Sequence, residues 1–289
     1  MRVQIITTLS ALAGSVQGIR ILQSNDDGWA ELYIRSLHES LKGAGHDVVL
    51  SSPAENKSGA GSRDEEPDPR KEPCMYDSCA ANSGPVGTNA SDPRLNWYGL
   101  STFGPQQWNG AAPELVVSGP NVGTNLWVQV PFSGTVGIAV HAAHEAKVPA
   151  LAFSGASSGT LRWDTDPVPQ RSTVYAALAA KLTDAVVASG APYLPEDVWL
   201  NVNMPKVEGD CTDPAKFVWV LTRLNPGWFS EKDVDHCGST RLPTETDVAL
   251  SGGCRIAVSV GDATDKTTAP MEKQTIVRDK LKSMLTCMP

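Results

Sequence analysis

An apolar segment that runs straight into an acidic turn is the feature that most constrains how this chain can fold. Residues 19–24 (Ile-Arg-Ile-Leu-Gln-Ser) read as a buried strand, and residues 25–28 (Asn-Asp-Asp-Gly) follow it without a spacer. The closing glycine allows the positive φ that tight turns often need. Apolar residues then recur at helical spacing over residues 33–41, and two glycines end the helix. This order predicts the first unit of an α/β sheet.

Strand and helix continue to alternate through the first two-thirds of the sequence. The predicted strands cover residues 47–53, 113–119, 148–153 and 198–203, and the predicted helices cover residues 133–146 and 171–189. This alternation indicates a Rossmann-like, doubly wound, mainly parallel sheet. We expect residues 19–205 to form this core, with an irregular insert over about residues 63–107 that is rich in Pro, Asp, Glu, Gly, Ser and Asn.

The last third of the chain has a different pattern. Residues 217–223, 244–250 and 255–260 read as strands without helices between them, and residues 273–285 as a terminal helix. We interpret residues 206–289 as a C-terminal antiparallel hairpin extension of a single domain that spans residues 19–289. Exposed strand edges seek partners, so we expect a homodimer.

The amino terminus has the composition of a signal peptide. Arg2 is the only charge in residues 1–18, and an apolar run and small residues follow it. The run is too short to span a bilayer, so no membrane segment is expected after its removal. We therefore expect a secreted, extracellular protein.

The cysteines agree with secretion. Six cysteines suit three disulfides in an oxidising compartment. The spacing leaves the connectivity open and suggests the pairs Cys74–Cys79, Cys211–Cys237 and Cys254–Cys287. A zinc site is the alternative, but the sequence has no C-x-x-C pair, in which two residues separate the cysteines.

The net charge of −8 limits the classes of partner. It argues against nucleic acid as a bulk electrostatic partner. An anionic substrate would also need a local cation to hold it.

Oxygen-bearing side chains end three of the predicted strands. The candidates are Asp26 and Asp27 after the first strand, Ser58 after the second and Asn121 after the third. If these strands are parallel, their turns meet at one edge of the sheet. Carboxylate, hydroxyl and amide oxygens suit a hard cation, so Mg²⁺, Mn²⁺ or Ca²⁺ is the expected metal.

An anion-binding segment is expected beside this metal. Ser133, Gly134 and Thr135 open a helix whose free N–H groups and hydroxyls form a cradle for an anion. A hard cation beside such a cradle is typical of a phosphate-ester site. The plainer alternative is that Asp26 and Asp27 only form a turn and cap the following helix.

Other readings of the sequence have less support. No G-x-G-x-x-G or Walker motif is present. His141 and His144 lie on the predicted cradle helix, and we interpret them as surface or packing residues rather than metal ligands. A secreted, non-catalytic protein that binds a phosphorylated ligand through a metal is the main functional alternative, and a glycan hydrolase or esterase is disfavoured.

Four motifs make the chain resemble the SurE survival-protein phosphatases, which act as 5′/3′-nucleotidases. These motifs are Ser24-Asn25-Asp26-Asp27-Gly28, Asn56-Lys57-Ser58-Gly59, Val117-Ser118-Gly119-Pro120-Asn121-Val122-Gly123-Thr124-Asn125 and Ser133-Gly134-Thr135-Val136. Weaker similarity continues at residues 221–223 and 245–247. The signal and the cysteines resemble secreted fungal-type members, some of which are described as acid phosphatases. The insert departs from the family pattern, which leaves the choice of substrate open.

The resemblance implies a reaction and a set of roles. Asp26, Asp27, Ser58 and Asn121 would hold the metal in a phosphomonoester hydrolase that acts on a small phosphorylated substrate. Asp26, Asp27 and Asn125 would be catalytic. The predicted substrate-binding residues are Asn25, Asn125, Ser133, Gly134 and Thr135. Attack by water and attack by an aspartate both remain open, and water is favoured if both aspartates bind the metal.

Overall fold

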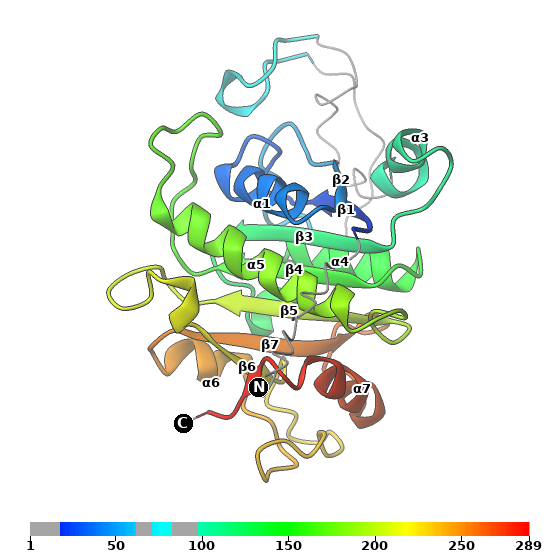
Figure 1. The fold of residues 1–289 in the computed structure, drawn as a ribbon, viewed down its shortest axis with the longest axis vertical. Coiled ribbons are helices and arrows are strands. Elements are labelled where there is room, and N and C mark those ends of the chain that lie inside the picture. Colours follow the sequence, from blue (N-terminus) through cyan, green and yellow to red (C-terminus); the bar gives the residue numbers. More distant parts are fainter. Residues whose placement is uncertain (1–17, 62–70, 83–97, 289) are drawn as a thin grey trace, which may run out of the picture.

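The computed structural model describes residues 18–61, 71–82 and 98–288, which form an α/β fold around one eight-stranded sheet (Figure 1). The strand order is β2-β1-β3-β4-β5-β7-β6-β8. The strands are β1 (Arg20–Ser24), β2 (Asp47–Leu50), β3 (Leu115–Val122), β4 (Ala150–Gly155), β5 (Val198–Met204), β6 (Val218–Thr222), β7 (Arg255–Asp262) and β8 (Leu285–Thr286). All neighbours pair in parallel except β5 and β7. The mainly parallel sheet predicted from the sequence is confirmed.

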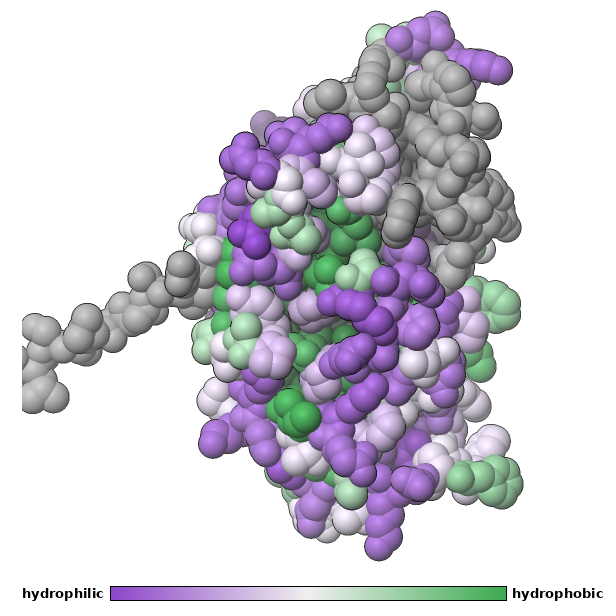
Figure 2. All heavy atoms as spheres, turned by 90° about the vertical axis from the view of Figure 1, so that its right-hand side faces the viewer, coloured by the Kyte–Doolittle hydropathy of each residue, from purple (hydrophilic) through white to green (hydrophobic). Residues whose placement is uncertain are grey.

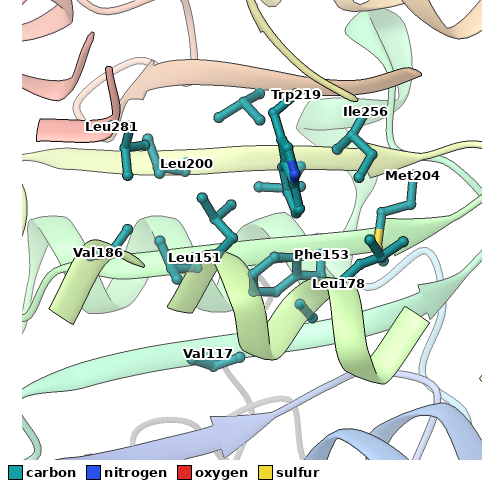
Figure 3. Packing of buried hydrophobic residues seen from close by; sticks show 14 of the residues in the cluster. Val117, Leu151, Phe153, Leu178, Val186, Leu200, Met204, Trp219, Ile256 and Leu281 are labelled. Carbon is teal, nitrogen blue, oxygen red and sulfur yellow. The ribbon is translucent and has the colours of Figure 1, made fainter. Parts of the chain in front are cut away.

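Helices cover both faces of this sheet. They are α1 (Leu32–Gly43), α3 (Gly104–Gln107), α4 (Gly134–His144), α5 (Gln170–Ala188), α6 (Glu245–Leu250) and α7 (Met271–Leu281). Alternate strand residues point to opposite faces. Val117 and Leu151 therefore pack with α1, α5 and α7, whereas Val116 and Ala152 pack with α4. Figure 3 shows the first of these cores, where side chains of β3, β4 and β5 meet α5 and Leu281 of α7.

The C-terminal third differs from its predicted form in two respects. Residues 245–250 form helix α6 rather than a strand, because Thr244 and Asp247 make a reciprocal capping box at its first turn. In addition, β6 and β7 pair in parallel, so they do not form a hairpin. Both strands extend the main sheet, and the antiparallel pairing predicted near the C-terminus occurs between β5 and β7.

Three disulfides use all six cysteines. Cys74–Cys79 is as predicted, but the other two pairs are Cys211–Cys254 and Cys237–Cys287, so the suggested pairs Cys211–Cys237 and Cys254–Cys287 are wrong. The reason is the parallel pairing of β6 and β7. The segments that precede these two strands lie at the same edge of the sheet, and Cys254 accepts a backbone hydrogen bond from Val218 there.

Several sequence predictions fall wholly or partly outside the described residues. The signal peptide (residues 1–18) and much of the insert at about residues 63–107 are among them. The described end of the insert is helical, in a turn of Gly99–Phe103 followed by α3, which differs from the irregular structure that we expected. No helix within the described residues is both long enough and apolar enough to cross a membrane.

A pocket of about 570 Å³ lies at the amino ends of β3, β4 and β5. Pro149, Leu194 and Val198 are among its lining residues. The side of the molecule that faces the viewer in Figure 2 carries the amino ends of these strands, and hydrophobic residues are exposed there between hydrophilic ones. The polar turns discussed next lie at the opposite edge, so this apolar pocket is not part of their site.

Candidate active site

The predicted metal-binding turns meet where the order of the strands reverses. In the order β2-β1-β3-β4, the chain passes from β1 to β2 on one side, and β3 lies on the other side of β1. Ligands of open α/β sheets bind at the carboxyl ends of the strands at such a switch point. The turn after β1 carries Asp26 and Asp27, and the end of β3 carries Asn121, so both sides of the switch point present oxygen atoms.

Asp27 is held by donors from three segments of the chain. Its Oδ1 accepts hydrogen bonds from Ser58 Oγ and Asn56 Nδ2, both at 3.1 Å. Its Oδ2 accepts the backbone N–H of Val122 at 2.7 Å and the Nδ2 of Asn25 at 3.1 Å. The side chain is 1% exposed. Asp27 therefore joins the turns that follow β1, β2 and β3.

A second cluster surrounds the hydroxyl of Thr135. Its Oγ lies 2.7 Å from Asp26 Oδ1, 3.0 Å from Asn25 Oδ1 and 3.1 Å from Asn121 Oδ1. One hydroxyl has one proton to donate, so three acceptor oxygens share a single donor here. A bulge in β3 between Ser118 and Asn121 brings the Asn121 side chain into this position. The cluster is rich in acceptors and poor in protons.

Helix α4 begins directly above this cluster. Ser133 caps the helix, and its Oγ accepts the N–H of Val136 at 3.1 Å. A β-carbon on Gly134 would lie 2.5 Å from Asp26 Oδ2, so glycine is required at this position. The positive end of the helix dipole is thereby placed beside the carboxylates.

The two aspartates do not cap the helix that follows them. Glu31 is the N-cap of α1, and its side chain accepts the N–H of Tyr33. The part of the plainer alternative in which Asp26 and Asp27 cap this helix is therefore wrong, although both residues lie in a turn. His144 pairs with Asp197 at the opposite edge of the sheet, in agreement with its interpretation as a surface residue.

The electrostatics of the cluster suit a divalent cation. Burial, and then the negative charge of Asp27, raises the pKa of Asp26 to about 6. Burial also raises the pKa of Asp27. No lysine, arginine or histidine of the described residues forms an ion pair with either carboxylate. Two buried carboxylates without a cationic partner are costly, and a bound cation would remove this cost.

The spacing of the oxygens also suits such an ion. Ser58 Oγ and Asp27 Oδ1 are 3.1 Å apart. Ligands of octahedral Mg²⁺ lie about 2.1 Å from the ion and at right angles, which places neighbouring oxygens about 3 Å from each other. The residues present therefore fit a hard divalent cation.

Asn125 lies next to this cluster but does not belong to it. Its Nδ2 donates to Ser154 Oγ at 2.8 Å, and Ser154 is the register partner of Asn121 on β4. Its main-chain oxygen accepts hydrogen bonds from the side chains of Asn201 and Asn203. The structure thus brings Asn125 to the same sheet edge as the proposed metal ligands.

Sequence reasoning missed several residues that support the site. The sequence marks Asn56 as a sequon close to Ser58 but predicts no contact with Asp27, and it predicts Asn201 and Asn203 only as strand residues. A local signal for the two β5 asparagines exists, because they interrupt the apolar segment Val198–Met204, in which every residue is buried. A buried strand residue that carries a carboxamide needs hydrogen-bond partners, and here the partner is the backbone of Asn125.

Comparison with known proteins identifies relatives of this chain. The family described as "Survival protein SurE" matches residues 21–225. An acid phosphatase of Yarrowia lipolytica is 32% identical in an alignment of length 290 that covers 83% of this chain and 78% of the relative. A 5′-nucleotidase SurE of Polaromonas naphthalenivorans is 32% identical over 250 residues, with 86% and 85% covered. A 5′-nucleotidase SurE of Geobacter metallireducens is 35% identical over 187 residues and covers 65% of each chain.

A solved structure has the same fold. The SurE protein of Aquifex aeolicus superposes with a TM-score of 0.60 over 90% of this chain and 98% of that chain, at 21% sequence identity. At this identity the likeness concerns the fold alone.

Proposed function

The chain belongs to the SurE family, and we propose that it is a divalent-metal-dependent phosphomonoester hydrolase of the nucleotidase or acid phosphatase type. Relatives named acid phosphatase and 5′-nucleotidase support the hydrolysis of phosphoric monoesters. The observation that supports the metal dependence is the pair of buried carboxylates, Asp26 beside Thr135 and the adjacent Asp27, which form no ion pair with a cationic side chain among the described residues.

The proposed metal ligands are Asp26, Asp27, Ser58 and Asn121. A divalent cation held there supplies charge to polarise a phosphoryl oxygen and to activate water. The donors around Asp27 fix the position of its carboxylate, and an aspartate that binds the metal would not be free to attack phosphorus itself. This supports water as the nucleophile, with Asp26 as the carboxylate that orients it.

The proposed phosphate contacts lie at the start of α4. Thr135 presents a backbone N–H group at the positive end of the helix, and Ser133 has a hydroxyl proton available because its oxygen serves as the cap acceptor. The N–H of Gly134 faces Asp26, so the predicted contact of Gly134 with phosphate stays a prediction. Asn125 lies just after the end of β3 and would bind a phosphoryl oxygen in the transition state. Asn25 is fully buried and bridges Asp27 and Thr135, so its predicted contact with substrate stays a prediction.

Export and assembly complete the proposal. Three disulfides support a secreted protein, since disulfides persist in oxidising compartments. The signal peptide over residues 1–18 is proposed on its sequence alone. A homodimer is supported by exposed apolar side chains in the last third of the chain, among which Trp228 is 78% exposed and Phe229 is fully exposed.

The test is phosphate release by the metal-free and the metal-loaded protein. The protein is treated with EDTA, dialysed and assayed on p-nitrophenyl phosphate, nucleoside monophosphates, sugar phosphates and polyphosphate, with Mg²⁺, Mn²⁺ or Ca²⁺ or with no addition. Release that depends on an added divalent cation is expected. Binding of a phosphorylated ligand without any release would instead support the non-catalytic alternative.

A further inference from the structure

A buried glutamate from the last third of the chain reaches the turn that carries Asn125. Glu245 lies at the start of α6 with none of its surface exposed. Its Oε1 accepts the backbone N–H of Trp127 at 2.7 Å, and its Oε2 accepts the Nδ2 hydrogen of Asn201 at 2.9 Å. Ser259 Oγ on β7 lies 3.0 Å from the same Oε2. A carboxyl group buried this deeply needs partners for both oxygens, and it has them.

Asn201 connects this glutamate to Asn125. Its Nδ2 also donates to the main-chain oxygen of Asn125 at 2.8 Å. Asn203 donates to the same oxygen at 3.1 Å and accepts the N–H of Asn125 at 2.9 Å. The N–H and the C=O of Asn125 are thus both hydrogen bonded to side chains of β5. Glu245 binds the N–H of Trp127, two residues further along the same turn.

The conformation of this turn requires such support. Trp127 has φ +36°, in the left-handed region that residues other than glycine rarely adopt. Backbone in sparsely populated regions persists only where surrounding contacts determine it. The hydrogen bond from the Trp127 N–H to Glu245 gives this support from outside the segment, in addition to the local contacts of Leu126 with Gln129.

We infer that Glu245 is a positioning residue for the hydrolysis of the phosphate ester, because it fixes the turn of residues 125–127 and thereby the direction of the Asn125 side chain. This inference rests on the proposed role of Asn125. Glu245 lies outside the segment matched by the SurE family, residues 21–225, so the turn at the catalytic edge depends on a residue from the C-terminal extension.

The chemistry of the site explains why a carboxyl group is needed there. Burial raises the pKa of Glu245 to about 8, so the neutral acid is accessible at neutral pH. Whether Glu245 is a carboxylate or a neutral acid, Oε1 can accept the N–H of Trp127 and Oε2 can accept the Nδ2 hydrogen of Asn201. The neutral acid can also donate its proton to Ser259 Oγ. A glutamine has one accepting oxygen, and its amide nitrogen would face either Trp127 or Asn201 donor to donor. Glu245→Gln should therefore lose the hydrogen bond to either Trp127 or Asn201 while keeping the volume of the side chain.

The experiment compares Glu245→Gln with Asp247→Asn. Asp247 lies in the same turn of α6, is exposed and bonds only to Thr244 in the capping box, so its variant disturbs the helix without touching the turn at Asn125. Backbone hydrogen exchange is measured on peptides that contain Trp127. Steady-state kinetics with p-nitrophenyl phosphate and the midpoint of Mn²⁺ activation are measured on the same proteins.

We expect Glu245→Gln to exchange faster at Trp127 and to lose kcat by about tenfold or more, since small misplacements of a catalytic group cost up to about a hundredfold. KM and the Mn²⁺ midpoint should change little, because Asn125 acts in the transition state and is not a proposed metal ligand. Asp247→Asn should match the wild type in all four quantities.

Unchanged exchange or unchanged kcat in Glu245→Gln would overturn the inference, as would a Trp127 amide that exchanges in the wild type as fast as in an unfolded peptide. The failure of the proposed function has a different signature. If the wild type hydrolyses no phosphate ester, the proposed function is wrong, and the exchange data still decide whether Glu245 holds the turn.

Discussion

Gly134 lies so close to Asp26 that a β-carbon at its position would be 2.5 Å from the carboxylate oxygen Oδ2. The start of helix α4 and the acidic turn after β1 therefore depend on each other. The backbone N–H of Gly134 also lowers the pKa of Asp26, in opposition to the larger effect of burial. The proposed phosphate cradle and the proposed metal site are thus parts of one structure.

The substitution Gly134→Ala should displace Asp26 and damage the metal site. We expect weaker Mn²⁺ binding by calorimetry and a loss of turnover of about a hundredfold. The added methyl group would displace the Asp26 carboxylate, and a small misplacement of a catalytic group is costly. Gly43→Ala is the matched control, since nothing lies within 4 Å of a β-carbon there and alanine is the better helix former. Normal Mn²⁺ affinity in Gly134→Ala would show that Asp26 does not bind the metal.

Asp27→Asn should abolish metal binding at micromolar concentrations of the ion. The substitution removes one charge, and the new amide group must also face N–H or O–H donors from Val122, Asn56 or Ser58. Turnover should collapse, and excess Mg²⁺ or Mn²⁺ should restore it only in part. Asp164→Asn is the control, since Asp164 is exposed and pairs with Arg162 on the surface. Wild-type turnover by Asp27→Asn in EDTA-treated buffer would contradict the metal-centred reaction.

Asn56 should carry no glycan although it begins an Asn-Lys-Ser sequon. Its Nδ2 donates to Asp27 Oδ1 at 3.1 Å, and its Oδ1 accepts the N–H of Ser58 at 2.7 Å. A glycan on Nδ2 would remove one of two donor hydrogens and place a bulky group beside a proposed metal ligand. Glycopeptide mapping of protein expressed through a glycosylating secretory pathway should find the asparagine unmodified. Full occupancy in active enzyme would remove Ser58 from the metal site.

The local part of this site could be predicted from the sequence, and the long-range part could not. Asp26 and Asp27 directly follow an apolar strand, so their place at the sheet edge follows from the pattern of parallel α/β folds. Thr244 and Asp247 carried the signal of a helix cap, but the β-branched and apolar residues around them favoured a strand. No local pattern connects Glu245 to Trp127 across 118 residues, because that contact exists only after β5, β7 and α6 have assembled. The disulfide partners depend in the same way on the parallel pairing of β6 and β7.

The stability of the metal-free protein should fall as the pH rises from about 4 to 6. Asp26 has its pKa raised from 3.8 to about 6 in the folded protein, mainly by burial, so the folded state holds a proton that the unfolded state releases. The resulting stabilisation is complete below pH 3.8 and is lost as the pH rises through 6, at a cost on the order of 2–3 kcal/mol for this group. Burial also raises the pKa of Glu31 to about 7 and that of Glu245 to about 8. The stability of the metal-free protein should therefore continue to fall towards pH 8.

A bound cation should reverse this loss, because it takes the place of the proton between the carboxylates. Urea unfolding at pH 4, 5, 6 and 7 should therefore show that Mg²⁺ or Mn²⁺ stabilises the protein more at each step upwards in pH, relative to EDTA. Asp26→Asn isolates the contribution of this group, since Asn cannot titrate and can still accept the hydroxyl proton of Thr135. The variant should lose less stability than the wild type between pH 4 and 6 in EDTA, and it should gain little from the cation. Equal losses in the two proteins would mean that Asp26 does not take up the proton, and the account of a cation-dependent carboxylate pair would then be wrong.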